Sequence, residues 1–163
     1  TAPKTRGVDQ MKTAIVMGEE KERIARMMED KFKTKANPNE SFIRDANAVR
    51  KSSTILLLGV SRDPPRPENP LNCGACGYGT CAEFIATGEK MGEDYTGPVC
   101  LFEGIDLGIA LGSAVKIASE LNIDNRIMYT IGAAARELDL LDSDVIIGIP
   151  LSVTGKSIYF DRK

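Results

Sequence analysis

The sequence predicts an α+β fold with an α/β-like order, in which helices cover a central sheet and a four-cysteine segment is inserted. Short apolar runs alternate with stretches of helical periodicity. The run at 53–60, STILLLGV, lacks polar alternation, as is typical of a strand buried on both faces. All four cysteines fall within residues 71–100. We therefore interpret residues 1–163 as a single domain and residues 71–100 as an insertion into it.

Composition limits the function classes. A chain of 163 residues, 42% hydrophobic and 27% charged, suffices for one domain with its own core. With 21 Lys and Arg against 23 Asp and Glu, it offers no basic surface for nucleic acid or anionic membranes. No apolar run reaches the ~20 residues that span a bilayer, and no signal peptide is recognisable. The start at Thr1, without methionine, is typical of a fragment.

The first third of the chain predicts one strand, two helices and a second strand. A polar lead-in at 1–10 precedes a strand at 11–18, and a helix at 19–32 places Ile24, Met27, Met28 and Phe32 at helical spacing. An Asn-Pro loop separates it from a short helix at 42–52. The central strand at 53–60 follows. Four prolines in residues 61–70 then predict a stiff linker that leads into the insertion.

The part after the cysteines predicts two helices, a strand and a docked C-terminal segment. The helix at 105–121 is apolar nearly all round, which favours burial on every side and hence a homodimer; Gly104, Gly108 and Gly112 suit close helix packing. A second helix follows at 125–140, with Asp124 as its N-cap. A strand at 144–153 is expected to break at Gly148 and Pro150. Tyr159 and Phe160 are expected to dock on the body or on a partner subunit.

The cysteine spacing C-x2-C-x4-C-x18-C is the strongest chemical signal. It sets Cys73, Cys76 and Cys81 among glycines, with Cys100 farther along, a pattern that suits a [4Fe-4S] cluster. Gly74 and Gly77 permit positive φ. Cys81 is expected to begin a helix from Thr80 to Lys90, whose N-terminus favours an anionic cluster, with Phe84 and Ile85 shielding it from water.

Two other uses of these thiols stay open. Four cysteines can bind one zinc ion, although zinc ribbons usually supply two C-x2-C pairs and this chain has one. Cys73 and Cys76 alone could form a redox-active pair. The chain has no histidine, which excludes Ser-His-Asp hydrolysis, mixed cysteine–histidine zinc sites and Rieske clusters. Sparse cysteines used as ligands also favour a reducing, cytoplasmic location.

The segment NCGACGYGTCAEFIATGEK…C resembles the four-cysteine [4Fe-4S] domain of the corrinoid iron–sulfur protein and of the B subunit of the Rnf complex. Cys73, Cys76, Gly77, Cys81 and Phe84 stand at the matching positions. The fourth cysteine of those domains is typically followed by proline, whereas Leu101 follows Cys100 here. The resemblance implies that the four cysteines of this chain are the metal ligands.

The whole chain resembles an uncharacterised family of ferredoxin-domain-containing proteins, on the segments TAPKTRGVD, FIRDANAV, CGACGYGTCAEF, IDLGIALGSAVKIA, DNRIMYTIGAAA and GIPLSVTGKSIYFDRK. The helix IDLGIALGSAVKIASELNI and the later IIGIPL are also similar to the nitroreductase-like flavoprotein fold. That resemblance implies a tight homodimer built on a long helix, with FMN at the interface. The arginines and serines that bind the FMN phosphate near the start of such proteins are not matched here.

These observations favour an iron–sulfur protein that transfers electrons to or from a protein partner or catalyses a redox reaction. The alternative is a non-catalytic dimeric module stabilised by a four-cysteine Fe–S or zinc site. No catalytic or flavin-binding residue is identified. Polar side chains at 124–129 suggest either a cap and surface network or a ligand pocket, and two Arg/Asp pairs suggest salt bridges. These residues are Asp124, Asn125, Arg126 and Tyr129, then Arg44 with Asp45 and Asp161 with Arg162.

Overall fold

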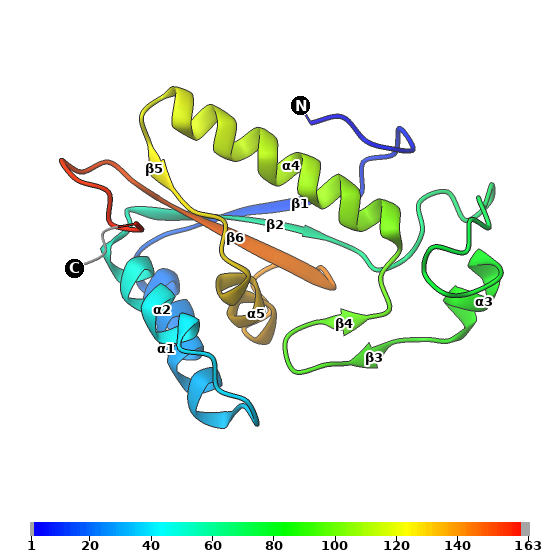
Figure 1. Ribbon diagram of the computed structural model, residues 1–163, viewed down its shortest axis with the longest axis horizontal. Coiled ribbons are helices and arrows are strands. Elements are labelled where there is room, and N and C mark those ends of the chain that lie inside the picture. The colour runs from blue at the N-terminus through cyan, green and yellow to red at the C-terminus, as the bar shows by residue number, and fades with distance from the viewer. Residues whose placement is uncertain (1, 161–163) are drawn as a thin grey trace.

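A four-stranded antiparallel sheet forms the centre of the computed structural model, which describes residues 2–160 (Figure 1). Its strands are β1 (Lys12–Val16), β2 (Thr54–Val60), β6 (Val145–Ser152) and β5 (Asp124–Asn125), in the order β1-β2-β6-β5. β2 pairs with β1 on one side and with β6 on the other. The apolar run thus occupies the interior of the sheet, as the absence of alternation predicts.

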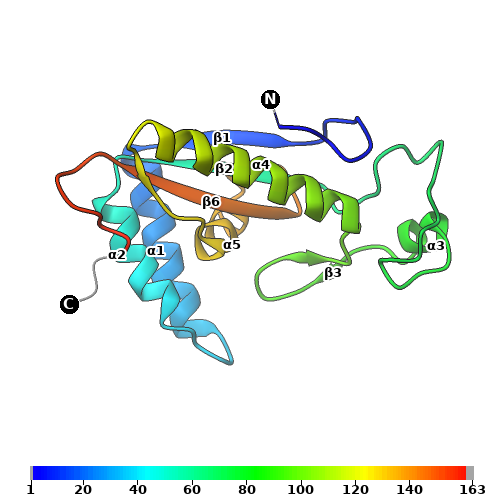
Figure 2. The same cartoon turned by 45° about the horizontal axis from the view of Figure 1, so that its top comes forward.

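Helices cover both faces of this sheet. α1 (Gly18–Thr34), α2 (Ser41–Lys51) and α5 (Tyr129–Glu137) pack against one face, and α4 (Leu101–Glu120) crosses the other (Figures 1 and 2). The first layer has the larger core, built from Ile24, Met28, Phe42, Val49, Ile55 and Ile131. A smaller core lies under α4 and is built from Leu58, Val60, Leu107, Leu111 and Ile149. This arrangement confirms the predicted α+β class. No helix in the described residues is both long and apolar enough to cross a membrane.

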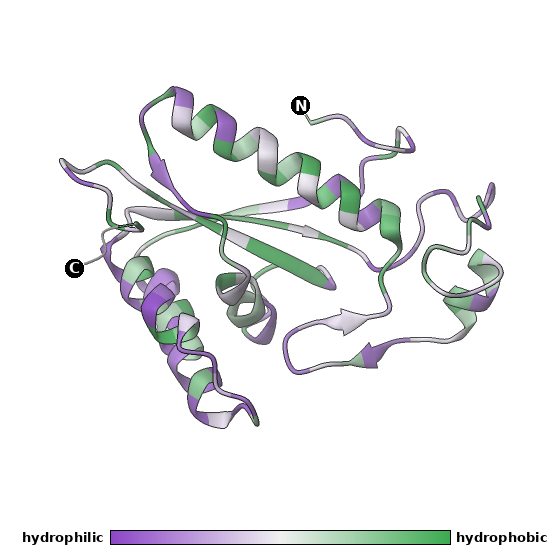
Figure 3. Ribbon diagram, viewed as in Figure 1, coloured by the Kyte–Doolittle hydropathy of each residue, from purple (hydrophilic) through white to green (hydrophobic). Residues whose placement is uncertain are grey.

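The long helix is buried on one side, in contrast to the prediction of burial all round. Leu107, Ala110 and Leu111 pack on the sheet, whereas Ile105 and Ile117 are 39% and 54% exposed. Figure 3 shows α4 in hydrophobic and neutral colours over most of its length, its outer side included. One chain therefore leaves an apolar helix face uncovered.

α5 and β6 approach so closely that two glycines are required between them. A Cβ on Gly132 would lie 1.6 Å from the carbonyl oxygen of Ile146, and one on Gly148 would lie 2.2 Å from Cγ2 of Ile131. Gly148 therefore serves this packing, and β6 runs through it without the predicted break.

Pro150 also lies within β6 and does not interrupt it. Gly148 exchanges both backbone hydrogen bonds with Met128, on the β5 side. Because backbone groups two residues apart in a strand face the same neighbour, Pro150 also faces the β5 side. The ladder on that side is interrupted between Met128 and Asn125. A proline is tolerated there because its missing N–H costs no ladder bond.

We expect Gly132→Ala to destabilise the chain by about 3 kcal/mol, because the added methyl group forces α5 away from β6. The measurement is the denaturant midpoint of the variant. Gly155→Ala is the matched control, since an added Cβ at Gly155 meets no described atom within 4 Å. Equal midpoints for both variants would contradict this packing argument.

Three element boundaries differ from the prediction. α5 begins at Tyr129 rather than at residue 125, and Asp124 belongs to β5 instead of capping a helix; the residue before α5 is Met128. α4 begins at Leu101, four residues earlier than predicted.

Between α3 (Cys81–Ala86) and α4 lies a hairpin that the sequence analysis missed, formed by β3 (Lys90–Met91) and β4 (Thr96–Gly97).

The C-terminal segment docks in part. Tyr159 is 6% exposed, but Phe160 is 60% exposed and lies under the Arg126 guanidinium at 5.1 Å. The predicted pair of Asp161 and Arg162 lies outside the described residues.

Candidate metal centre at the cysteine segment

The structure brings Cys100 to one small pocket together with the three cysteines that are close in sequence. Cys73, Cys76, Cys81 and Cys100 all line it, and we call it the cysteine pocket. Its other walls come from Pro64, Gly74, Tyr78, Thr80, Phe84 and Leu101. All four thiols are free, and they range from the exposed Cys73 to the buried Cys100. The segment around α3 lies beside the sheet, near the end where α4 begins (Figure 1).

A glycine turn shapes the first side of the pocket. Gly74 and Gly77 have φ values of 74° and 88°, in the left-handed region that glycine adopts without strain. The Gly77 N–H donates to the Gly74 carbonyl at 2.9 Å, which closes the turn between Cys73 and Cys76. This agrees with the positive φ angles expected from the sequence.

The short helix α3 presents Cys81 as its first residue. Thr80 Oγ1 accepts from the Glu83 N–H at 3.1 Å, and the Glu83 carboxylate accepts from the Thr80 N–H at 3.3 Å, a complete capping box. The Asn72 side chain accepts from the Cys81 N–H at 2.9 Å and so ties this helix to the first cysteine. The N-terminal end of α3 therefore faces the pocket with its electropositive side.

Aromatic packing closes the pocket floor. Phe84 is 1% exposed, and its ring meets Tyr78 edge to face at 5.8 Å between centroids. Ile85 is 41% exposed and does not line the pocket, so the expectation that it shields the thiols is wrong. The reason is that α3 ends at Ala86, well short of the predicted Lys90, and buries only one face.

Cys100 occupies the N-cap position of α4. Its N–H donates to the Arg62 carbonyl at 2.9 Å, which fixes it to the end of β2. Burial raises the pKa of the Cys100 thiol, and backbone N–H groups of Phe102 and Glu103 at the helix start act in the opposite direction. A metal bound by this sulfur would hold it as thiolate.

The four cysteines line one pocket and offer sulfur ligands of the kind that zinc ions and iron–sulfur clusters both take. In residues 2–160, no group of three or more Cys, Asp, Glu or His residues is placed to hold a single metal ion.

The missed hairpin anchors the cysteine segment to the helical layer. The Tyr95 hydroxyl lies 2.9 Å and 3.0 Å from the carbonyl oxygens of Tyr129 and Ile146. On α1, Lys31 donates to the Glu93 carbonyl at 2.8 Å, and Lys35 pairs with Asp94. The sequence signal for this hairpin was the two adjacent acidic residues and the tyrosine of GEDY, which resemble an ordinary polar loop.

Two buried carboxylates lie on α4 just beyond Cys100, and sequence reasoning did not single them out. Glu103 and Asp106 are each 2% exposed. Asp106 accepts from the Thr5 N–H at 2.8 Å and thereby fixes the N-terminal lead-in. Burial, with a smaller contribution from the Asp106 charge, raises the pKa of Glu103 to about 7. The sequence pattern that could have identified Glu103 and Asp106 is the presence of two acidic residues on the side of the helix that otherwise carries apolar residues.

We expect Glu103→Gln to remove part of the pH dependence of stability. A carboxyl whose pKa is higher in the folded state than in the unfolded state stabilises the fold at low pH, and this contribution is lost as the pH rises toward about 7. The variant should therefore match the wild type at pH ~5 and melt a few degrees higher at pH ~8. The exposed Glu120→Gln, on the same helix, is the control. Parallel melting curves for wild type and Glu103→Gln across this range would contradict the expectation.

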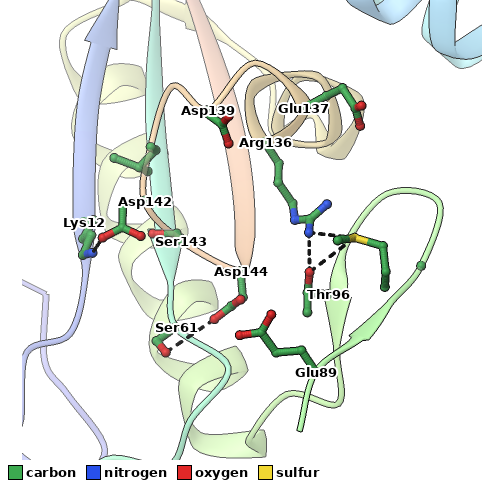
Figure 4. Close-up of a pocket in the computed structure, with 13 residues that line it drawn as sticks. Lys12, Ser61, Glu89, Thr96, Arg136, Glu137, Asp139, Asp142, Ser143 and Asp144 are labelled. Atoms are coloured by element: carbon green, nitrogen blue, oxygen red, sulfur yellow. Dashed lines mark hydrogen bonds and ion pairs between the residues drawn. The ribbon is translucent and has the colours of Figure 1, made fainter.

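A second, larger pocket lies between the hairpin, the end of α5 and the start of β6 (Figure 4). Figure 4 shows the carboxylates of Glu89, Asp139, Asp142 and Asp144 around it, with Arg136 reaching across to Thr96. Glu137 adds a fifth carboxylate, against the two cations Lys12 and Arg136. This excess of negative charge disfavours the phosphate of a flavin.

The polar residues at 124–129 form a network that holds the C-terminal segment. Asp124 accepts from the Ile158 N–H at 2.9 Å, and Arg126 donates to the Tyr159 carbonyl at 3.1 Å. The interpretation as a surface network is therefore the one that these contacts support. Arg44 and Asp45 form the predicted salt bridge at 2.8 Å.

Sequence comparison places the chain in a family. A family model described as "Uncharacterized protein containing a ferredoxin domain" matches residues 96–162. A protein of Archaeoglobus fulgidus, described as "Uncharacterized protein", is 51% identical over 162 residues, which is 99% of this chain and 84% of that protein. The chain belongs to this ferredoxin-domain family. The residues matched by the family model include Cys100 and leave out Cys73, Cys76 and Cys81.

Structural comparison gives the fold of this ferredoxin-domain protein. Two solved variants of the FMN and NADPH-dependent nitroreductase NfnB, from "sphigopyxis sp. strain HMH", superpose on it with TM-scores of 0.56 and 0.54. Sequence identity is 13% and 12%, and each match covers 99% of this chain and 77% of the other. The ferredoxin-domain protein therefore has a nitroreductase-like fold, as its sequence resemblance implies.

Proposed function

We propose that Cys73, Cys76, Cys81 and Cys100 hold a [4Fe-4S] cluster and that the protein transfers electrons, one at a time, in a redox reaction. The observation that supports this most is the meeting of all four cysteines at one pocket. The ferredoxin-domain family suggests an iron–sulfur role in general terms. Beyond this general role, we propose the [4Fe-4S] cluster type, the four cysteine ligands and the transfer of electrons.

The surrounding residues suit an anionic cluster. When bound, the cluster supplies reversible one-electron chemistry. The start of α4 directs the backbone N–H groups of Phe102 and Glu103 toward Cys100, and such groups stabilise negative charge. Phe84 and Tyr78 exclude water from one side, while the exposed Cys73 leaves the other side open to a redox partner.

We also propose a homodimer formed through α4. Its outer face combines Ile105 with Gly104, Gly108 and Gly112, and an added Cβ at any of these glycines meets no described atom within 4 Å. Another backbone can approach closely along such a stripe. Sparse cysteines that are free rather than paired in disulfides fit a reducing, cytoplasmic location.

FMN is the second cofactor that we propose. The fold likeness to an FMN-dependent nitroreductase is the observation that favours it. With both cofactors, the protein would act as an oxidoreductase. Without FMN, the alternative is a dimeric module that uses its metal site for stability.

The test measures iron, sulfide, zinc and flavin on one anaerobic sample. We expect a brown protein with broad absorption near ~400 nm and about four iron and four sulfide per chain. One equivalent of zinc in colourless protein would reject the cluster. Flavin released on denaturation would support the oxidoreductase, whereas iron and sulfide without flavin would leave electron transfer or the stabilised module.

A further inference from the structure

Arg62 is a buried cation directly behind the cysteine pocket. It follows β2 in the proline-rich stretch at 61–70, which was expected to act as a linker. Arg62 is 4% exposed and Pro64 and Pro65 are also buried, so this stretch is packed against the protein body. A buried arginine requires partners that compensate for its lost hydration.

The contacts of Arg62 join the later parts of the cysteine segment to the sheet. Its Nε donates to the Pro98 carbonyl at 3.1 Å and one terminal nitrogen donates to the Phe84 carbonyl at 3.3 Å. Its guanidinium lies over the Phe84 ring at 4.7 Å. Through its backbone it accepts from the Cys100 N–H at 2.9 Å and donates to Asp144 at 2.7 Å. α3, the strand before Cys100 and the sheet therefore meet at this residue.

The charge of Arg62 is only partly neutralised. Its partners on Pro98 and Phe84 are carbonyl groups, and the nearest carboxylate of its ion pair, on Asp63, lies at 3.7 Å and is 52% exposed. Phe84 and Cys100 separate the guanidinium from the pocket, and both line that pocket. A positive charge thus lies one side chain away from the thiols, in a region shielded from solvent, where charge interactions are stronger than at the surface.

We propose that Arg62 sets the reduction potential of the cluster by stabilising its reduced form. This inference rests on the proposed cluster. A cluster gains one negative charge on reduction, so a nearby buried cation stabilises the reduced state more than the oxidised state and raises the potential. Arg62 does not line the pocket and is not a ligand. It acts on the cluster through the electric field of its charge and by holding Phe84 and Cys100 in position.

The test is a redox titration of anaerobically loaded protein, followed by optical absorption and by the electron paramagnetic resonance of the reduced cluster. We expect Arg62→Met to lower the reduced-to-oxidised ratio about tenfold at a given potential, a shift of about 59 mV for one electron. Arg62→Lys keeps the charge and should remain close to the wild type. Arg66→Met, which removes an exposed cation from the same stretch, is the matched control and should shift the potential less.

A second variant covers the case in which Arg62→Met loses the cluster. Arg62→Gln removes the charge but keeps an amide donor for the Pro98 or Phe84 carbonyl, so it should lower the potential as Arg62→Met does. An unchanged potential in fully loaded Arg62→Met or Arg62→Gln would overturn the role of Arg62 while leaving the cluster proposal intact. A wild-type chain that binds no iron and sulfide would instead overturn the proposed function.

Discussion

A Cys100→Ser variant, loaded anaerobically beside the wild-type chain, is expected to retain about tenfold less iron and sulfide. Cys100 is the most buried of the four thiols and caps α4, so its sulfur has the most fixed position in the pocket. Serine is nearly isosteric and is a favourable N-cap residue, so the helix should be preserved while the soft ligand is lost. Cys76→Ser should give the same loss from the opposite wall of the pocket.

The measurement combines iron and sulfide analysis with circular dichroism, which reports whether the fold survives. No cysteine can serve as a control, because all four cysteines of the chain are proposed ligands. The control is therefore Thr87→Ser, a conservative change in the same segment but outside the pocket lining. Full iron and sulfide in well-folded Cys100→Ser would remove Cys100 from the ligand set. That result would agree with the one departure from the resembling [4Fe-4S] domains, in which proline typically follows the fourth cysteine, whereas Leu101 follows Cys100 here.

A Gly108→Leu variant is expected to be monomeric, whereas the wild type should elute with twice the mass of one chain. In the single chain the new side chain enters open space, and replacing glycine inside a helix is favourable by about 0.8 kcal/mol. In a dimer packed through α4, the same side chain separates the two helices at their closest approach. Gly108→Leu should therefore raise the melting temperature if the chain is monomeric and lower it if the chain is a dimer packed through α4.

Light scattering coupled to size-exclusion chromatography gives the mass, and a thermal melt gives the sign of the stability change. Gly155→Leu is the control, because Gly155 also faces open space but lies in the C-terminal segment, away from α4. A monomeric wild type whose melting temperature rises in Gly108→Leu would show that α4 faces solvent and would reject the dimer.

Strong local signals in the sequence were sufficient for most of the fold. The apolar run of β2, the helical periodicity of α1 and the cysteine spacing each arise from neighbouring residues. They located the central strand, the first helix and the segment that forms the pocket. The positive φ angles at Gly74 and Gly77 are also predicted locally, because a tight turn between two cysteines needs them.

The misses have a common physical cause, which is tertiary contact. Gly148 and Pro150 are strand breakers by local preference, but the close approach of Ile131 and the gap in the β5 ladder make them suitable inside β6. The residues around Arg62 were interpreted as a linker because four prolines dominate that stretch. Its burial depends on Phe84 and Pro98, which sequence periodicity cannot bring next to it.

The pairing of β2 with β6 has a consequence for how the protein is made. These two strands are neighbours in the sheet, yet the entire cysteine segment lies between them in the chain. During synthesis, all four thiols leave the ribosome before the strand that completes the centre of the sheet. Contacts between distant segments form slowly because a long loop must close first. The nascent chain therefore presents its thiols before β6 can close the sheet.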